Sequence, residues 1–213
     1  MGSCLKTQQS KAVERKDAIT VAVEDLKARG LISQDVRIIV KEQGASEILP
    51  ISTNLPKKQI VCSCDMNALD ENQLRFCMLH EYAHIVLYPQ FMMQMGFAVS
   101  IWIAAFILLL RADLTSLLAV GPVYLLGRVI FSNVTYRYEL AADHRAGQLI
   151  KAEFEVKCPS EVLHLALFHV RNLKGKRLSK AEFFLKVIGY KHPKDLQREM
   201  KVAEKLDEII CRQ

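Results

Sequence analysis

The chain has 213 residues, of which 51% are hydrophobic, and it carries a formal net charge of +6. This length is enough for one domain with a hydrophobic core, or for such a domain with a small appendage. The sequence has no basic stripe with interleaved aromatic residues and no recognisable nucleic-acid-binding motif, so its charge does not indicate a nucleic-acid partner. The hydrophobic excess lies between Phe91 and Phe131 and the positive charge lies in the two flanks. Such a balance suits a protein that rests against an anionic membrane surface.

Six cysteines are scattered along the chain, and the N-terminal residues ahead of Gly30 are polar with helical spacing. We recognise no cleavable signal peptide there, so a reduced, cytosol-facing compartment fits the cysteine usage best. Cys62 and Cys64 would lie on the same face of a strand, where they could pack or bind a metal ion. Because no second pair follows at zinc-finger spacing, packing is the preferred interpretation.

The first ninety residues predict a helix, a small sheet and a second helix. Apolar residues recur at helical spacing within Gln8–Arg29, and Gly30 is a natural helix stop. Three β-type runs separated by turn residues then predict a small sheet. These runs are Val36–Glu42, Glu47–Thr53 and Lys58–Cys64.

Asp70 is typical of a helix N-cap, and Gln73 three residues later would complete a capping box. The helix that follows is predicted to cover Glu71–Tyr88, with Pro89 ending it. This helix contains the sequence HEYAH, His80–His84, so the motif falls in the middle of a capped helix that a strand precedes.

Two apolar runs follow. Phe91–Leu110 contains no charge and would be about 30 Å long as a helix, which is enough to cross a bilayer. After the polar turn Arg111–Asp113, the run Leu114–Phe131 is interrupted only by Arg128. We predict a transmembrane hairpin, with a buried helical hairpin of a soluble protein as the alternative. Both ends of the hairpin must emerge on one side, and their Lys and Arg residues predict that this side is the cytoplasm.

The C-terminal part reads as helical. One helix carries Glu139 and Asp143 four residues apart. Further helices are predicted to begin near Ser160, at Ser179 and after Pro193. The sequence shows no internal repeat and no low-complexity tract.

The HEYAH sequence has the residue types and spacing of a zinc helix. His80 and His84 share a helix face, so both imidazoles can point at one ion. Glu81 points about 100° away from His80 and would act as general base toward a water at the metal. A catalytic zinc site has three protein ligands, and Glu139 is the candidate for the third. Asp143 is the candidate for a hydrogen-bond partner of one of the histidines. The alternative is that Glu139 and Asp143 form a solvated helix face.

Three segments together resemble the HtpX and CAAX-prenyl-protease family of membrane zinc metallopeptidases, which are gluzincins. They are HEYAH (His80–His84), ELAAD (Glu139–Asp143) and HPKDLQR (His192–Arg198). The resemblance implies a gluzincin-like core in which Glu139 is the third ligand of one zinc ion per chain. It also implies an endopeptidase at a membrane, often acting on misfolded or membrane-associated proteins.

The chain departs from this family in two places. Members often have additional spans ahead of the zinc helix, whereas here one hairpin follows it, which favours an HtpX-like protease over prenyl-protein processing. The Ser-Arg commonly found before the glutamate is replaced by Thr135-Tyr136, with Arg137 shifted by one position. Candidate donors to the oxyanion are His192, ranked first, Arg137 and Tyr136. For His192 the preferred alternative is a histidine that stands at the helix entry before Pro193 and has no catalytic role. The strand Lys58–Cys64 is expected to offer an exposed edge to an extended substrate.

Taken together, these features predict a mostly helical α+β protein, with a gluzincin-like metalloprotease core, a small sheet and an inserted transmembrane hairpin. Residues 1–90 and 132–213 are predicted to form one catalytic domain, and residues 91–131 the hairpin. The predicted function is a zinc endopeptidase of protein or peptide substrates in the cytoplasmic membrane, with its catalytic part facing the cytoplasm. Two alternatives remain: a soluble regulatory metalloprotease with the same motif, and a membrane protein that binds zinc without catalysis.

Overall fold

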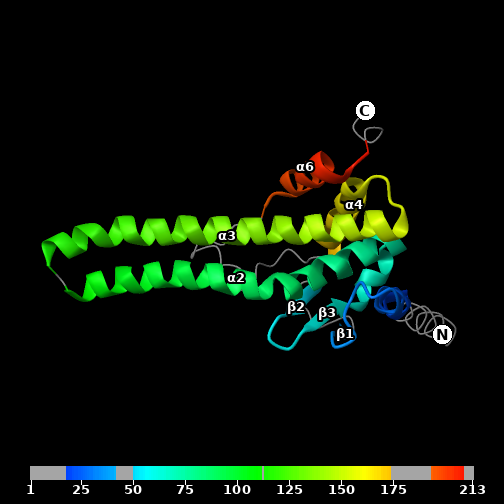
Figure 1. Ribbon diagram of the computed structural model, residues 1–213, viewed down its shortest axis with the longest axis horizontal. Coiled ribbons are helices and arrows are strands. Elements are labelled where there is room, and N and C mark those ends of the chain that lie inside the picture. The colour runs from blue at the N-terminus through cyan, green and yellow to red at the C-terminus, as the bar shows by residue number, and fades with distance from the viewer. Residues whose placement is uncertain (1–17, 42–49, 112, 174–192, 209–213) are drawn as a thin grey trace, which may run out of the picture. The chain divides into compact units, whose positions relative to one another are not determined.

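The computed structural model describes residues 18–41, 50–111, 113–173 and 193–208 (Figure 1). The chain divides into two compact units. The first unit comprises residues 1–85, 142–176 and 194–213, and the second comprises residues 86–141 and 177–193. The predicted hairpin segment 91–131 lies within the second unit.

The described part of the N-terminal helix covers residues 18–28. It buries Ile19, Val23 and Leu26, the apolar stripe that predicted it. Gly30 follows with a φ of 71°, and the backbone N–H of Leu31 donates to the Leu26 carbonyl at 2.9 Å. A left-handed residue of this kind is what closes a helix C-terminus, so the predicted stop is confirmed.

The three predicted β-type runs form one small sheet in the order β1-β3-β2. Strand β1 (Arg37–Lys41) pairs in parallel with β3 (Gln59–Ser63), and β2 (Ile51–Asn54) pairs with β3 in antiparallel orientation. The predicted strand Lys58–Cys64 therefore contains the central strand, and its expected role as an exposed edge is wrong. Both sides of β3 are used by partner strands, a matter of pairing that hydrophobic pattern alone does not reveal.

Helix α2 (Glu71–Arg111) begins where predicted, with the N–H of Gln73 donating to the Asp70 carboxylate at 2.8 Å. The Gln73 side chain does not complete a capping box, since its Oε1 contacts His169 Nδ1 at 2.9 Å. The predicted end of the helix at Pro89 is also wrong, because α2 continues through it. A proline removes one backbone donor from a helix, whereas breaking an apolar helix would leave many backbone groups without partners.

Helix α3 (Leu114–Phe154) is preceded by Asp113, whose carboxylate accepts a hydrogen bond from the N–H of Ser116 at 2.8 Å. The second apolar run and the segment carrying Glu139 were predicted as separate helices. They are instead one continuous helix.

Within the second unit, α2 and α3 run side by side as the predicted helical hairpin (Figure 1). Phe91 stacks on Tyr138 with ring centroids 4.2 Å apart, and Trp102 packs against Phe131 at 5.3 Å. These two aromatic pairs are contacts between α2 and α3 at two separate positions along the hairpin.

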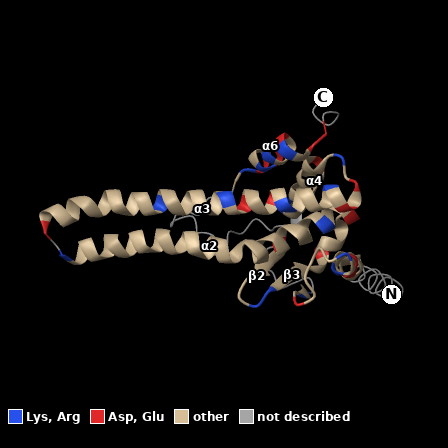
Figure 2. Cartoon of the chain, viewed as in Figure 1, with Lys and Arg blue, Asp and Glu red and all other residues tan. Residues whose placement is uncertain are grey.

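Both α2 and α3 are long and apolar enough to cross a membrane, judged by length and composition. Only 11% of the most apolar stretch of α2 and 17% of that of α3 is buried. Figure 2 shows few charged residues along these stretches, apart from the turn that joins the two helices. The core helix of a soluble protein would be mostly buried instead.

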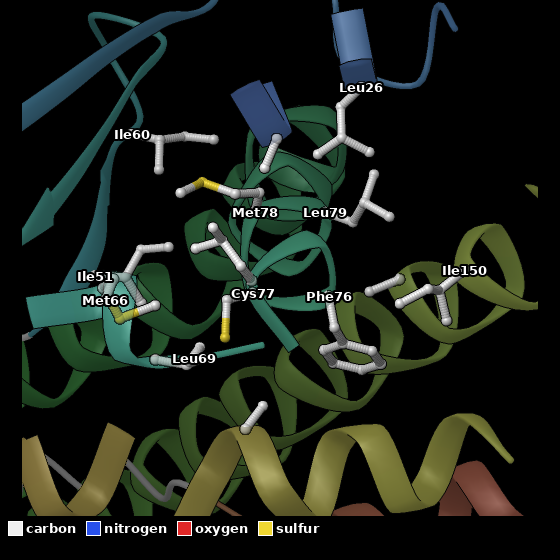
Figure 3. Packing of buried hydrophobic residues seen from close by; sticks show 14 of the residues in the cluster. Leu26, Ile51, Ile60, Met66, Leu69, Phe76, Cys77, Met78, Leu79 and Ile150 are labelled. Carbon is white, nitrogen blue, oxygen red and sulfur yellow. The ribbon is translucent and has the colours of Figure 1, made fainter. Parts of the chain in front are cut away.

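The first unit contains the main hydrophobic core (Figure 3). Phe76, Met78 and Leu79 of α2 are almost completely buried in it, together with Ile60 of β3 and Ile150 of α3. Large apolar side chains thus anchor the first turns of α2 in the core.

Two further helices complete the described part of the first unit. Helix α4 (Pro159–Leu173) and helix α6 (Asp195–Leu206) confirm the predictions near Ser160 and after Pro193. The helix predicted at Ser179 lies outside the described residues. The fold is therefore mostly helical with one small sheet, as predicted.

The cysteines show different states. Cys62 is buried with its Sγ 3.9 Å from the Met78 sulfur, so it packs as expected. Cys62, Cys64 and Cys77 are free thiols, whereas Cys158 is disulfide-bonded. The expectation of reduced cysteines does not hold for Cys158.

Candidate metal centre

Helix α2 brings the two histidines of HEYAH to one point. His80 and His84 are four residues apart, so they lie one above the other on the same helix face. Their Nε2 atoms are 3.1 Å apart, and the rings meet edge to face with centroids 4.6 Å apart. Both side chains are almost completely buried.

This separation fits a shared metal ion. In tetrahedral coordination with Zn–N bonds of about 2.0–2.1 Å, two ligating nitrogens are about 3.3 Å apart. A direct hydrogen bond between the rings would give a similar distance, if one Nε2 donated and the other accepted.

Glu139 on α3 supplies a third ligand atom. Ligand atoms of His80, His84 and Glu139 all lie within 4.8 Å of one another, and the Glu139 carboxylate is buried. Within the part of the chain that the structure describes, these residues form the one such group of three. Two imidazoles and a carboxylate are a common donor set for zinc, so this group could hold a metal ion.

Asp143 lies one helical turn after Glu139 and orients His80. Its Oδ1 is 2.9 Å from His80 Nδ1, which can donate a hydrogen bond to the carboxylate. With the proton on Nδ1, the lone pair of His80 is on Nε2, the atom that faces His84. Histidines that ligate metals are typically held by a carboxylate in this way, so the contact of His80 with Asp143 is compatible with a metal ligand.

Arg198 on α6 holds Asp143 in turn. Its Nε and its terminal nitrogen each donate to one Asp143 oxygen at 2.6 Å, a two-pronged contact between two buried side chains. Burial alone would raise the pKa of the Asp143 carboxyl, but Arg198 and then His80 outweigh it, and the pKa is held well below its usual range. Asp143 is therefore a fixed anion against which the His80 ring is set.

Glu81 comes directly after His80 on α2 and is half-buried. The hydroxyl of Thr53 on β2 donates to its carboxylate Oε2, and the same hydroxyl oxygen is 3.2 Å from the Glu81 backbone carbonyl. The predicted general base is thus in direct contact with the small sheet.

The other predicted candidates are placed as follows. His192, ranked first as the oxyanion donor, lies outside the described residues. Arg137 is exposed on α3, and Tyr136 is half-buried. His164 pairs with Glu199 of α6 at 3.0 Å and His169 contacts Gln73, so both have partners in the fold.

The sequence analysis singled out Arg198 only as the last residue of the HPKDLQR segment, without a contact or a role, and it did not single out Thr53. Arg198 had a readable signal, because it precedes Val202 and Leu206 at helical spacing and shares their buried face. Thr53 had none, since its contact with Glu81 depends on which strand lies at the sheet edge.

No family model, no curated protein and no solved structure matches this chain.

Proposed function

We propose that this protein is a membrane-anchored zinc endopeptidase of the HtpX-like kind. The observation that carries the proposal is the buried group of His80, His84 and Glu139, with His80 oriented by Asp143. The resemblance of the segments that carry these residues to those of the HtpX and CAAX-prenyl-protease family adds support. A gluzincin-like core is part of this proposal.

Each residue has a distinct role in the proposed reaction. His80, His84 and Glu139 would hold the ion, and the Asp143 carboxylate beside Nδ1 of His80 would keep the ring in the orientation and tautomer of a ligand. The chemistry that zinc supplies when bound is polarisation of a carbonyl and a lowered pKa of water. Glu81 takes a proton from the attacking water and returns it to the leaving amine, so that the peptide bond is hydrolysed.

We further propose that the α2–α3 hairpin spans the cytoplasmic membrane, with the first unit on the cytoplasmic side. The exposed apolar surface of both helices supports a lipid environment. The basic flanks support the cytoplasmic orientation, because positively charged flanks are retained there. The disulfide at Cys158 is a feature of oxidising compartments and counts against it, so orientation needs its own experiment.

The decisive experiment compares wild type with Glu81→Gln, both purified in detergent. Metal content is measured by atomic emission, and hydrolysis is measured with an unfolded protein such as casein. We expect about one zinc per chain in both proteins and cleavage only in wild type, because Gln cannot accept the proton. His84→Ala is the control for the metal, and we expect it to lose zinc and cleavage together.

Other outcomes have clear meanings. Zinc in both proteins with equal cleavage would contradict the role of Glu81. Zinc in both with no cleavage of any unfolded protein or peptide library would favour the non-catalytic zinc-binding alternative. Absence of zinc and of other divalent ions from wild type would contradict the metal centre itself.

A further inference from the structure

Strand β2 reaches the proposed general base through a single side chain. In the sheet, Thr53 lies opposite Ile60 of the central strand β3, and β2 forms the edge of the sheet. The Thr53 hydroxyl donates to Oε2 of Glu81, one residue after the first histidine of the metal group. This contact joins the edge of the sheet to the helix that carries the metal ligands.

We propose that Thr53 is a positioning residue that holds the Glu81 carboxylate in its working orientation. The inference rests on the proposed function, since it assigns Thr53 an effect on catalysis through Glu81. Thr53 acts on Glu81 and itself touches neither the metal nor the substrate.

The physical basis is the freedom of a glutamate side chain. Glu has three rotatable bonds, and a half-buried Glu on a helix can adopt several rotamers. A hydroxyl that donates to one carboxylate oxygen selects one of these rotamers, and it uses only part of the capacity of a carboxylate to accept hydrogen bonds. Positioning of this kind matters, because a misplacement of 1 Å can cost about 100-fold in rate.

The contact also fits the chemistry of the two elements. Thr is favoured in strands because its branched side chain suits a pleated surface. A Thr at position 53 therefore supplies the hydroxyl without weakening the strand preference of β2. A carboxylate that accepts from a hydroxyl forms a charge-assisted hydrogen bond, which is stronger than one between neutral groups.

A purely structural role is the competing explanation. The Thr53 oxygen is also 3.2 Å from the Glu81 carbonyl, so Thr53 could serve only to fasten β2 to α2. A fastening role would affect folding and substrate binding alike, whereas a positioning role affects the chemical step.

The experiment uses full-length zinc-loaded protein in detergent and three variants. Thr53→Val removes the hydroxyl and keeps the shape, whereas Thr53→Ser keeps the hydroxyl. Ser52→Ala removes a hydroxyl from the neighbouring position, whose side chain points to the opposite face of the strand. The kinetic constants are measured on a fluorogenic peptide that wild type cleaves.

We expect Thr53→Val to lower kcat by about 10- to 100-fold with KM unchanged within about twofold and zinc content unchanged. Thr53→Ser should recover kcat to within about threefold of wild type, and Ser52→Ala should match wild type. An unchanged kcat in Thr53→Val would overturn the proposal, as would a loss of kcat that Thr53→Ser does not recover.

A second readout is independent of catalysis. Thermal unfolding of metal-free protein is compared for wild type, Thr53→Val, Glu81→Ala, which removes the acceptor oxygens, and the double variant. If Thr53 binds the carboxylate, the drop in Tm caused by Thr53→Val is smaller when Glu81 is already replaced. Equal drops would overturn the proposal. If the drop is smaller in the Glu81 background but the wild-type protein hydrolyses no peptide, the contact is confirmed. The proposed function and the catalytic role of Thr53 are then both rejected.

Discussion

Replacing Arg198 tests most directly whether the pairing of Arg198 with Asp143 supports the metal centre. Replacing Arg198 by Met leaves the Asp143 carboxylate buried without its guanidinium partner. We expect Arg198→Met to lower the free energy of unfolding by about 3–5 kcal/mol, the usual cost of breaking a buried ion pair. Zinc affinity should fall about 10- to 100-fold, because Arg198 no longer holds Asp143, the hydrogen-bond partner of His80, in place. Denaturant unfolding of metal-free protein and zinc competition titrations measure the two effects.

Arg171→Met is the matched control for Arg198. Arg171 of α4 pairs with Asp195 of α6 at 2.9 Å, but its side chain is 75% exposed. Such an exposed ion pair contributes about 0–1 kcal/mol to the free energy of unfolding, and we assign this one no role in supporting the metal ligands. Equal losses of stability in the two variants would contradict the importance assigned to the buried pair.

Cys62 and Cys77 predict a pH dependence of stability. Burial raises the pKa of both thiols to about 12, from an ordinary value of 9.0. Above pH 9 the unfolded chain releases these protons while the folded chain keeps them, so stability falls as pH rises through this window. Between pH 8 and pH 10, each thiol should lower the free energy of unfolding by about 1 kcal/mol.

This dependence is checked by denaturant unfolding at the two pH values. The double variant Cys62→Ala/Cys77→Ala removes the two thiols and should show a smaller decrease, whatever its absolute stability. An equal decrease in wild type and in the double variant would show that other groups cause it.

At the scale of the element, the hairpin depends on close packing at Gly127. A methyl group there would lie 2.5 Å from the Trp102 indole nitrogen and 3.3 Å from Ile101, so neighbouring side chains would have to move. We expect Gly127→Ala to lower stability by about 1–3 kcal/mol, the typical cost of overpacking. Gly121→Ala is the control, because a methyl group at Gly121 meets nothing within 4 Å. Thermal unfolding in detergent should show a lower Tm for the first variant alone.

Helices α2 and α3 show where signals from neighbouring residues were insufficient to predict a helix end. Pro89 and Pro122 both lie inside helices, although proline usually ends or kinks one. The apolar residues on both sides of each proline maintain the helix, because its internal hydrogen bonds satisfy the backbone away from water. The Asp70 and Gly30 signals were read correctly, since a cap acts through contacts within a few residues.

At the scale of the whole molecule, the proposed membrane hairpin predicts a location and an orientation. The protein should remain in the membrane fraction after alkaline carbonate washing, because about forty apolar residues are withdrawn from water. Alkaline phosphatase fused after Gln213 of the full chain should be inactive, and the same reporter inserted after Arg111 should be active. Expression in a bacterium with paired fluorescent-protein fusions at the same positions measures orientation.

The opposite reporter pattern would reverse the orientation and agree with an oxidising environment for Cys158. Release of the protein by carbonate would contradict the span and favour the soluble protease alternative. Each result is separate from the zinc and cleavage measurements.

The sequence by itself determined those features that depend on neighbours along one element. His80, Glu81 and His84 could be identified because helical periodicity alone puts the two imidazoles on one face. The apolar hairpin and the caps at Asp70 and Gly30 are local for the same reason. Only the tertiary structure decided the strand order, the contact of Thr53 with Glu81 and the pairing of Asp143 with Arg198. These contacts join residues 28 and 55 positions apart, and they form only where the packing of helices and sheet brings distant segments together.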